Sequence, residues 1–266
     1  MLIVIFLVLA LISALLYFYF AGTVIWKAAL LFVGVFIALN LVYLLFWAVY
    51  SLFLSTKPLE KKNSFCHSGC VGILSLVLDY SWVRAHISGI EKLPEKENFL
   101  MVCNHRSGFD PLITLTRLHR YNIAFISKPS NMELPCVGKL AQGMGCLPID
   151  RENDRNALKT ILQAADYIKR GICSVGIYPE GTRSRNGQLL DFHAGSFKIA
   201  QKAKSPLVIA CIRGSENITH NVLRRASDVY LDILEVVPAE KVCSMSTKEL
   251  AEYSREIIGQ HLEAAV

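Results

Sequence analysis

Two long apolar runs at the start of the chain constrain its fold more than any other feature. They cover residues 1–20 and about 28–54, and Lys27 is the one charged side chain among the first 56 residues. A helix needs about 20 apolar residues to cross the hydrocarbon core of a bilayer. We therefore expect a helical hairpin over residues 1–56 that anchors the chain in a membrane.

The residues after the second run bear on the orientation of this hairpin. Lys57, Lys61 and Lys62 follow it closely, and cytoplasmic loops carry an excess of such cations. The rest of the chain is therefore expected on the cytoplasmic side. The short link at residues 21–23 leaves two geometries open, because the hairpin could cross the bilayer twice or dip into one leaflet and return.

About 210 residues follow the hairpin, enough for one globular domain with a sizeable core. They hold 27 of the 28 Lys and Arg residues and all 22 acidic residues, a net charge of +5. This sign suits an anionic membrane surface or a phosphorylated substrate. No basic run with interleaved aromatic residues is present, so nucleic acid is not expected as a partner.

The eight cysteines give little support for a metal site. Only Cys66 and Cys70 lie close together, with His67 between them, whereas structural zinc sites usually need two such pairs. We expect no metal, and we interpret the other cysteines as reduced thiols in the core of a cytoplasmic domain.

After the hairpin we expect a basic linker and an amphipathic helix over residues 57–83, with the helix at Val71–Val83 lying on the membrane or on the domain. Residues 84–266 alternate short strand-like and helical segments. The strands are expected at 83–87, 99–102, 123–126, 146–149, 172–178, 207–212 and 229–236, and helices near 111–118, 137–142, 156–169, 195–202 and 247–264. Such alternation favours an α/β domain with a mostly parallel sheet flanked by helices. Functional residues of such sheets lie in loops beyond the carboxyl ends of the strands.

One of these loops holds a histidine and an aspartate five positions apart, His105 and Asp110. A neutral imidazole can take a proton from a hydroxyl near neutral pH, and a carboxylate can orient and stabilise it. No nucleophilic side chain is adjacent, which suggests that the substrate supplies the nucleophile. The alternative is structural, because Asp110-Pro111 also has the form of a helix start with Asp as the N-cap.

A basic residue follows each of three further predicted strands: Lys128, Arg151 and Arg183. Arginine offers a two-pronged donor and lysine a point charge, so together they could hold a phosphate monoester. Each could instead be an ordinary surface charge. Glu180, three residues before Arg183, could also form a purely structural ion pair with it.

Taken together, these segments resemble the glycerolipid acyltransferase family, most closely the lysophosphatidic acid acyltransferases. The family's first block, Asn-His-x-Ser-x-x-Asp (the HXXXXD motif), is matched by Asn104, His105, Ser107 and Asp110. Its second block, a Gly followed by a hydrophobic strand that ends in Arg, is matched by Gly145–Arg151, and its third, Glu-Gly-Thr-Arg-Ser, by Glu180–Ser184. Its fourth, a Pro that opens an apolar strand, is matched by Pro206–Ile209. Two departures occur. Pro148 lies inside the second block, which suggests an edge strand or a bulge, and Lys128 precedes Pro129 rather than the family's usual x-Glu-Leu.

The resemblance implies a membrane-bound enzyme that acylates lysophosphatidic acid to phosphatidic acid. It makes His105 the general base and Asp110 its orienting partner. The implied substrate-binding residues are Asn104, Ser107, Lys128, Arg151, Glu180, Gly181, Thr182 and Arg183, with the cations on the phosphate and Glu180 on the glycerol or on Arg183. No cofactor is implied, only an acyl-CoA or acyl-carrier-protein thioester as co-substrate.

Three alternatives stay open. The acceptor could be glycerol 3-phosphate or a lysophospholipid with a headgroup. The chain could be a metal-dependent hydrolase with His105, Asp110 and Glu180 as ligands, although no paired-histidine spacing supports one. An inactive lipid-binding module is disfavoured because every motif residue is intact.

Overall fold

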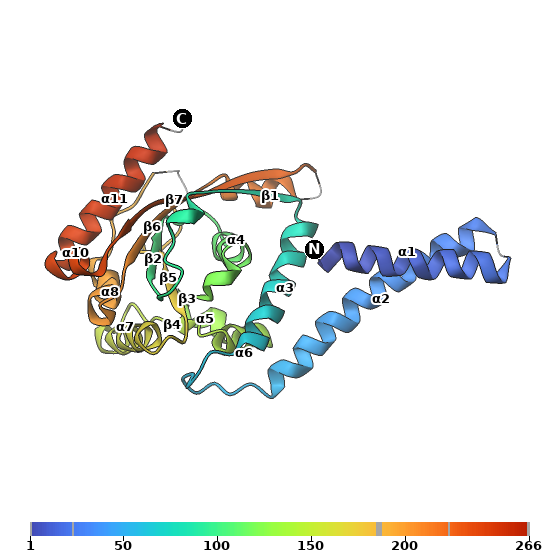
Figure 1. Cartoon of the computed structure of the whole chain (residues 1–266), viewed down its shortest axis with the longest axis horizontal. Coiled ribbons are helices and arrows are strands. Elements are labelled where there is room, and N and C mark those ends of the chain that lie inside the picture. Colours follow the sequence, from blue (N-terminus) through green and yellow to red (C-terminus); the bar gives the residue numbers. More distant parts are fainter. Residues whose placement is uncertain (1, 23, 185–187, 223, 265–266) are drawn as a thin grey trace.

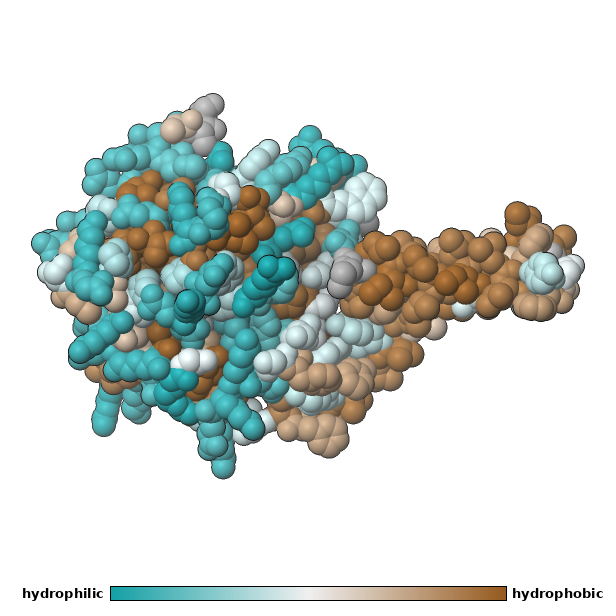
Figure 2. Space-filling model, in the orientation of Figure 1, coloured by the Kyte–Doolittle hydropathy of each residue, from teal (hydrophilic) through white to brown (hydrophobic). Residues whose placement is uncertain are grey.

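The computed structural model describes residues 2–22, 24–184, 188–222 and 224–264. The helices α1 (Leu2–Ala21) and α2 (Ile25–Leu52) form a hairpin that projects away from the rest of the chain (Figure 1). Its surface is almost wholly apolar (Figure 2). Both helices are long and apolar enough to cross a membrane. The structure thus confirms the predicted hairpin.

Helix α3 (Ser64–Tyr80) differs from the expected helix at Val71–Val83. It begins seven residues earlier, where the Asn63 side chain accepts a hydrogen bond from the Cys66 amide at 3.1 Å, and Val83 belongs to the first strand. The expected bounds were therefore wrong. The start of the helix mixes the exposed Ser64 and Ser68 with the buried His67, so a hydropathy pattern does not mark it.

Helix α3 connects the hairpin to the domain. One face contributes Cys66 and Cys70 to the domain core, beside helix α6 (Val137–Gly143). Trp47 of α2 covers the backbone of Gly69, where an added Cβ would overlap the indole ring. The Tyr43 hydroxyl also donates to the Gly69 carbonyl at 3.3 Å. A glycine at this position thus lets α2 approach α3 closely.

Within the described residues, the strands form one sheet in the order β1-β7-β6-β2-β5-β3-β4. Their bounds are β1 (Val83–Ser88), β2 (Leu100–Cys103), β3 (Ile123–Ser127), β4 (Leu147–Pro148), β5 (Ser174–Ile177), β6 (Leu207–Arg213) and β7 (Ser227–Val237). All neighbours are parallel except β6 and β7. The sheet is therefore mostly parallel, as predicted, and Pro148 lies on an edge strand.

Helices cover both faces of the sheet (Figure 1). On one face lie α3, α4 (Asp110–Arg117) and α6, and on the other α7 (Asp154–Lys169), α8 (Lys198–Ala203) and α11 (Thr247–Ala264). The remaining short helices are α5 (Pro129–Met132), α9 (Ile218–Asn221), α10 (Ala239–Ser244), η1 (Ile90–Lys92), η2 (His119–Tyr121), η3 (Ala194–Phe197) and η4 (Ser215–Asn217). Every residue of β2 and β5 is buried, as expected for strands covered on both faces.

The topology brings distant loops together. Strands β2, β3, β4, β5 and β6 run parallel to one another, so their carboxyl ends meet at one edge. The loops that follow these ends start with Asn104, Lys128, Ile149, Tyr178 and Gly214. This edge is therefore where the predicted site residues can gather.

Candidate active site

His105 and Asp110 form a close pair directly after β2. Nδ1 of His105 lies 2.8 Å from Oδ2 of Asp110, and their side chains are 18% and 0% exposed. Within the described part of the chain, Nε2 makes no hydrogen bond, and His105 lines an open cavity. One ring nitrogen is therefore fixed by the carboxylate while the ring faces a space large enough for a substrate.

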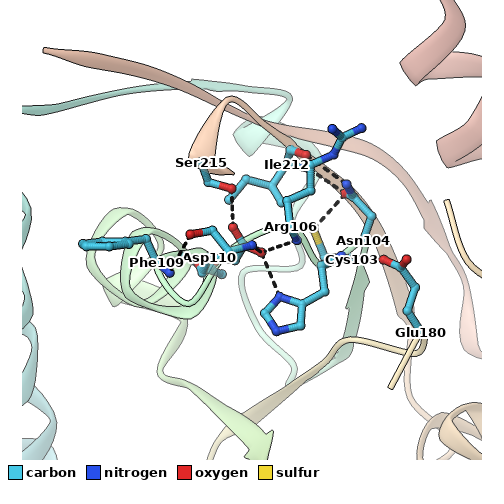
Figure 3. Close-up of polar contacts among 11 residues, drawn as sticks. Cys103, Asn104, Arg106, Phe109, Asp110, Glu180, Ile212 and Ser215 are labelled. Atoms are coloured by element: carbon cyan, nitrogen blue, oxygen red, sulfur yellow. Dashed lines mark hydrogen bonds and ion pairs between the residues drawn. The ribbon is translucent and has the colours of Figure 1, made fainter. Parts of the chain in front are cut away.

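The Asp110 carboxylate is surrounded by donors (Figure 3). Besides His105, the amides of Arg106 and Ser107 donate to Oδ2 at 2.7 and 2.8 Å, and the Ser215 hydroxyl donates to Oδ1 at 2.5 Å. These contacts turn the carboxylate back toward the loop before α4. Asp110 is thus not the N-cap of that helix, because Phe109 holds the cap position without a side-chain bond.

Glu180 holds the backbone of His105. Its Oε1 accepts from the His105 amide at 2.6 Å and its Oε2 from the Leu190 amide at 3.0 Å. Ser184 adds a further tie, because its amide donates to the His105 carbonyl at 2.9 Å. Burial raises the pKa of Glu180, and the two amide donors oppose that shift. Among the described residues Glu180 forms no ion pair with Arg183, so the alternative of a structural pair is not realised there.

Asn104 and Ser107 do not face the cavity, although the resemblance implies that they bind substrate. Both are buried and neither lines the cavity. The Asn104 amide group donates to the Ile212 carbonyl at 2.9 Å and accepts from the Ile212 amide at 2.8 Å. The Ser107 hydroxyl accepts from the Phe109 amide at 3.3 Å. Both side chains therefore shape the loop that carries His105 rather than face a ligand.

The cavity beside His105 has a volume of about 590 Å³. Its lining includes Lys128, Arg151 and Arg183 from three different strand ends, together with Gly181 and Thr182. Over the residues that the structure describes, no carboxylate lies within ion-pair distance of these three cations. Partial burial lowers the pKa of the Arg151 guanidinium. An anion entering the cavity would thus meet three cations that no carboxylate of the described residues neutralises.

Aromatic rings support the histidine from one side. Tyr178 stacks on His105 with ring centroids 4.2 Å apart and planes 14° apart, and Phe125 stacks on Tyr178 at 5.1 Å. Burial raises the pKa of the Tyr178 hydroxyl well above its ordinary value, so the ring stays neutral.

Three residues of the site were not predicted from the sequence: Tyr178, Phe125 and Ser215. The first two belong to strand-like apolar runs, and nothing near Ser215 in the sequence marks it.

Gly181 occupies a position that only glycine suits. Its φ of +74° lies in the left-handed region, and a Cβ there would sit 2.9 Å from Nε2 of His193 and 3.5 Å from Nη1 of Arg151. The two basic side chains therefore converge over the bare backbone of Gly181.

The described residues offer little support for the metal-dependent hydrolase. They contain no group of three His, Cys, Asp or Glu side chains arranged to hold a metal ion. Cys66 and Cys70 have sulfur atoms 4.0 Å apart, and both lie against the carbonyl of Leu140. Asp110 engages four donors, and both oxygens of Glu180 accept from backbone amides.

Comparisons with known proteins converge on one family. The Acyltransferase family profile matches residues 84–213. The chain is 30% identical over 166 residues to the 1-acyl-sn-glycerol-3-phosphate acyltransferase of Escherichia coli K12, covering 62% of this chain and 67% of that protein. It is 26% identical over 185 residues to the protein of the same name from Borreliella burgdorferi, covering 68% and 72%.

A solved structure shares the fold. It is the crystal structure of the 1-acyl-sn-glycerophosphate (LPA) acyltransferase PlsC from Thermotoga maritima, with a TM-score of 0.62 at 22% identity. The alignment covers 96% of this chain and 95% of that one, so it includes the hairpin as well as the sheet.

Proposed function

Because the chain belongs to the acyltransferase family that includes the 1-acyl-sn-glycerol-3-phosphate acyltransferases, we propose that it acylates the free hydroxyl of lysophosphatidic acid with an acyl thioester, giving phosphatidic acid. The observation that carries this proposal is the His105–Asp110 pair at 2.8 Å, on the wall of a cavity that also holds Lys128, Arg151 and Arg183. It supplies a base for a hydroxyl and cations for a phosphate in one space.

The chemical step uses the acceptor as the nucleophile. Nε2 of His105 takes the proton of the acceptor hydroxyl as its oxygen attacks the thioester carbonyl. The new oxygen–carbon bond forms, the carbon–sulfur bond breaks, and the leaving thiolate takes the proton back from the imidazolium. Asp110 stabilises the positive imidazolium meanwhile. A thiolate leaves readily, so the step needs neither an acyl-enzyme nor a cofactor.

Several side chains keep the base in place. Glu180 and Ser184 fix the backbone of His105, and Ser215 fixes Asp110. Tyr178 fixes the plane of the imidazole ring and places a π face against the developing positive charge. General-base catalysis depends on geometry first, so these contacts support the proposed role of His105.

The three cations of the cavity suit the phosphate monoester of the acceptor. Arg151 and Arg183 can each offer a two-pronged donor, and Lys128 adds a point charge. Lysophosphatidic acid has such a phosphate with no headgroup esterified to it. A site with three cations and no neutralising carboxylate among the described residues favours this acceptor over a lysophospholipid whose phosphate carries a headgroup.

The hairpin would hold this site at the bilayer, where the lysophospholipid lies. Its apolar surface supports an anchor, and its packing on α3 through Trp47 and Gly69 joins that anchor to the domain. The cations at Lys57, Lys61 and Lys62 favour the cytoplasmic face. The acyl donor, coenzyme A or acyl carrier protein, would then reach the site from the cytoplasm.

An acceptor panel tests the proposal. Purified full-length protein in vesicles is given an acyl thioester with lysophosphatidic acid, glycerol 3-phosphate or lysophosphatidylcholine. We expect phosphatidic acid from the first acceptor and far less product from the other two. A preference for either other acceptor would contradict the proposed acceptor, and hydrolysis of the thioester without transfer would contradict the reaction.

A further inference from the structure

A second cavity of about 590 Å³ lies beside the first. Arg151, Tyr178 and Gly181 line both, so these three residues form the wall that the two cavities share. His105 stacks on Tyr178 from the side of the first cavity. The second cavity therefore starts next to the base, yet the proposed binding of the acceptor leaves it without an occupant.

The walls of the second cavity differ in character. One is apolar and comes from the strand ends and from α7, where Leu158 and Ile161 lie one turn apart. Leu158 is 45% exposed, so much of its side chain is open to an occupant of the cavity. A second part of the lining holds His193 and Lys198, at and after the η3 turn.

The charge of the second cavity is mainly positive. Arg151 and His193 converge over Gly181, and Lys198 adds a third basic side chain. Asp154 also lines the cavity, but within the described residues it forms no ion pair with any of these groups. An occupant with an anionic end and an apolar or amide-containing chain would match this lining.

The proposed reaction requires a second substrate beside the base. The acceptor phosphate would occupy the side of the first cavity with Lys128 and Arg183, so the thioester has to approach the base from another direction. Every acyl thioester of coenzyme A or of acyl carrier protein carries the same phosphopantetheine arm. That arm has methylene and amide groups next to the sulfur and a phosphate at its far end.

We propose that the second cavity holds the phosphopantetheine arm of the acyl donor, with Lys198 facing its phosphate and Leu158 covering its methylene groups. This inference rests on the proposed acyltransferase function. The arm would enter past Lys198, and its thioester would emerge at Tyr178 beside His105. The donor and the acceptor would thus bind in adjacent cavities that meet at the base.

Two substitutions with matched controls test the proposal on the full-length protein. Lys198→Met removes the cation, and Lys202→Met removes an exposed lysine on the same helix that does not line the cavity. Leu158→Gln alters the apolar wall, and Leu162→Gln alters an equally exposed leucine one turn later on α7. Three acyl donors are compared: acyl-CoA, the acylated form of acyl carrier protein, and S-acyl pantetheine. The last has the arm but no phosphate.

With Lys198→Met we expect the KM for acyl-CoA or for acylated acyl carrier protein to rise roughly three- to tenfold. This is the effect expected from the loss of one partly exposed, charge-assisted hydrogen bond. The KM for S-acyl pantetheine and for lysophosphatidic acid should not change. Leu158→Gln should raise the KM for all three donors. The wild-type preference between acyl-CoA and acyl carrier protein then shows which of the two delivers the arm.

Three results would overturn the inference: an unchanged KM for the phosphate-bearing donors in Lys198→Met, an equal rise for S-acyl pantetheine, or a Leu158→Gln effect that grows with acyl-chain length. The last would show that the cavity holds the acyl chain. All three require an active wild-type enzyme, so they are distinct from a failure of the proposed function, in which the wild type itself would not acylate lysophosphatidic acid.

Discussion

The Ser215 hydroxyl lies 2.5 Å from Oδ1 of Asp110, although the two residues are 105 positions apart in the chain. Ser215 is fully buried and follows β6, whereas Asp110 opens α4 after β2. The contact ties two loops together at the carboxyl edge of the sheet. It also completes the set of donors around the carboxylate that orients His105.

Replacing Ser215 with Ala should therefore lower kcat and leave the KM for lysophosphatidic acid nearly unchanged. With one donor fewer, the Asp110 carboxylate is held less firmly, and so is the orientation of His105 that depends on it. A hydrogen bond to a charged group contributes roughly 1.5–3 kcal/mol, so we expect a rate loss of about tenfold or less, because Asp110 keeps its other donors. Initial-rate kinetics of both proteins measure kcat and KM separately.

Ser88→Ala is the matched control, because the Ser88 hydroxyl donates to Asp232 at 2.6 Å far along the sheet. It should leave kcat unchanged. If Ser215→Ala lowers the melting temperature alone and leaves kcat unchanged, the serine has a structural role only.

Replacing Arg183 with Ala should raise the KM for lysophosphatidic acid more than the KM for the acyl donor. Arg183 lines the first cavity and, among the described residues, has no carboxylate partner. Because it is exposed, screening reduces the loss, and we expect about a tenfold rise. Lys128→Ala should act in the same direction but more weakly. Initial-rate kinetics with each substrate varied in turn measure the effect.

Arg155→Ala removes an exposed arginine of α7 that lines neither cavity, and it should change neither KM. Equal rises in both KM values with Arg183→Ala would indicate that Arg183 maintains the loop rather than binds the phosphate.

The buried His67 should lower the free energy of unfolding in acid, because the folded protein disfavours the protonated form of its side chain. Burial, and then the nearby Lys62 and His119, lower its pKa from 6.5 to about 4. The unfolded chain therefore binds a proton more readily between these values, and the free energy of unfolding should fall as the pH drops from about 6.5 to about 4. With screening allowed for, we expect a loss of about 1–2 kcal/mol. His67→Leu should reduce this loss, as measured by thermal melts at pH 7 and pH 5.

His220→Leu, at an exposed histidine, should leave the difference between the two melts unchanged. The idea fails if His67→Leu retains the full acid destabilisation of the wild type.

Gly69→Leu should uncouple the hairpin from the domain. A side chain there would meet the Trp47 ring at once, and such overpacking costs about 1–3 kcal/mol. The apolar surface of the hairpin stays intact, so vesicle binding should persist. Activity on long-chain lysophosphatidic acid in vesicles should fall severalfold, while activity on a short-chain soluble analogue should stay near normal.

Gly34→Leu, at a position on α2 with open space around it, should leave both activities unchanged. An equal loss on both acceptors with Gly69→Leu, in a folded protein, would mean that the hairpin shapes the site itself rather than only holding it at the bilayer.

The sequence predicted the parts of this site that depend on strand order. Alternating strands and helices indicate a parallel sheet, and a parallel sheet gathers its carboxyl ends at one edge. The positions of Lys128, Arg151 and Arg183 at three strand ends were therefore enough to predict that they lie together. Their chemistry suggested a phosphate monoester, and the resemblance to a family then named lysophosphatidic acid as its bearer.

The sequence could not distinguish side chains that face the cavity from those that hold its walls. Asn104 and Glu180 belong to the same motifs as His105 and Arg183, yet both bond to backbone groups. Ser215 was missed because its contact depends on the position of β6 beside β2, which no local pattern encodes. The start of α3 was missed because exposed serines there interrupt the apolar pattern.

The most direct test of the central claim compares His105→Ala with His86→Ala in the acylation of lysophosphatidic acid. His86 is a matched control, because it too lies 2.9 Å from an aspartate, Asp228, but on strand β1 and outside both cavities. We expect His105→Ala to lower kcat by roughly 10²–10⁴-fold with an unchanged melting temperature, and His86→Ala to keep wild-type activity. Near-full activity of a folded His105→Ala protein would contradict the account.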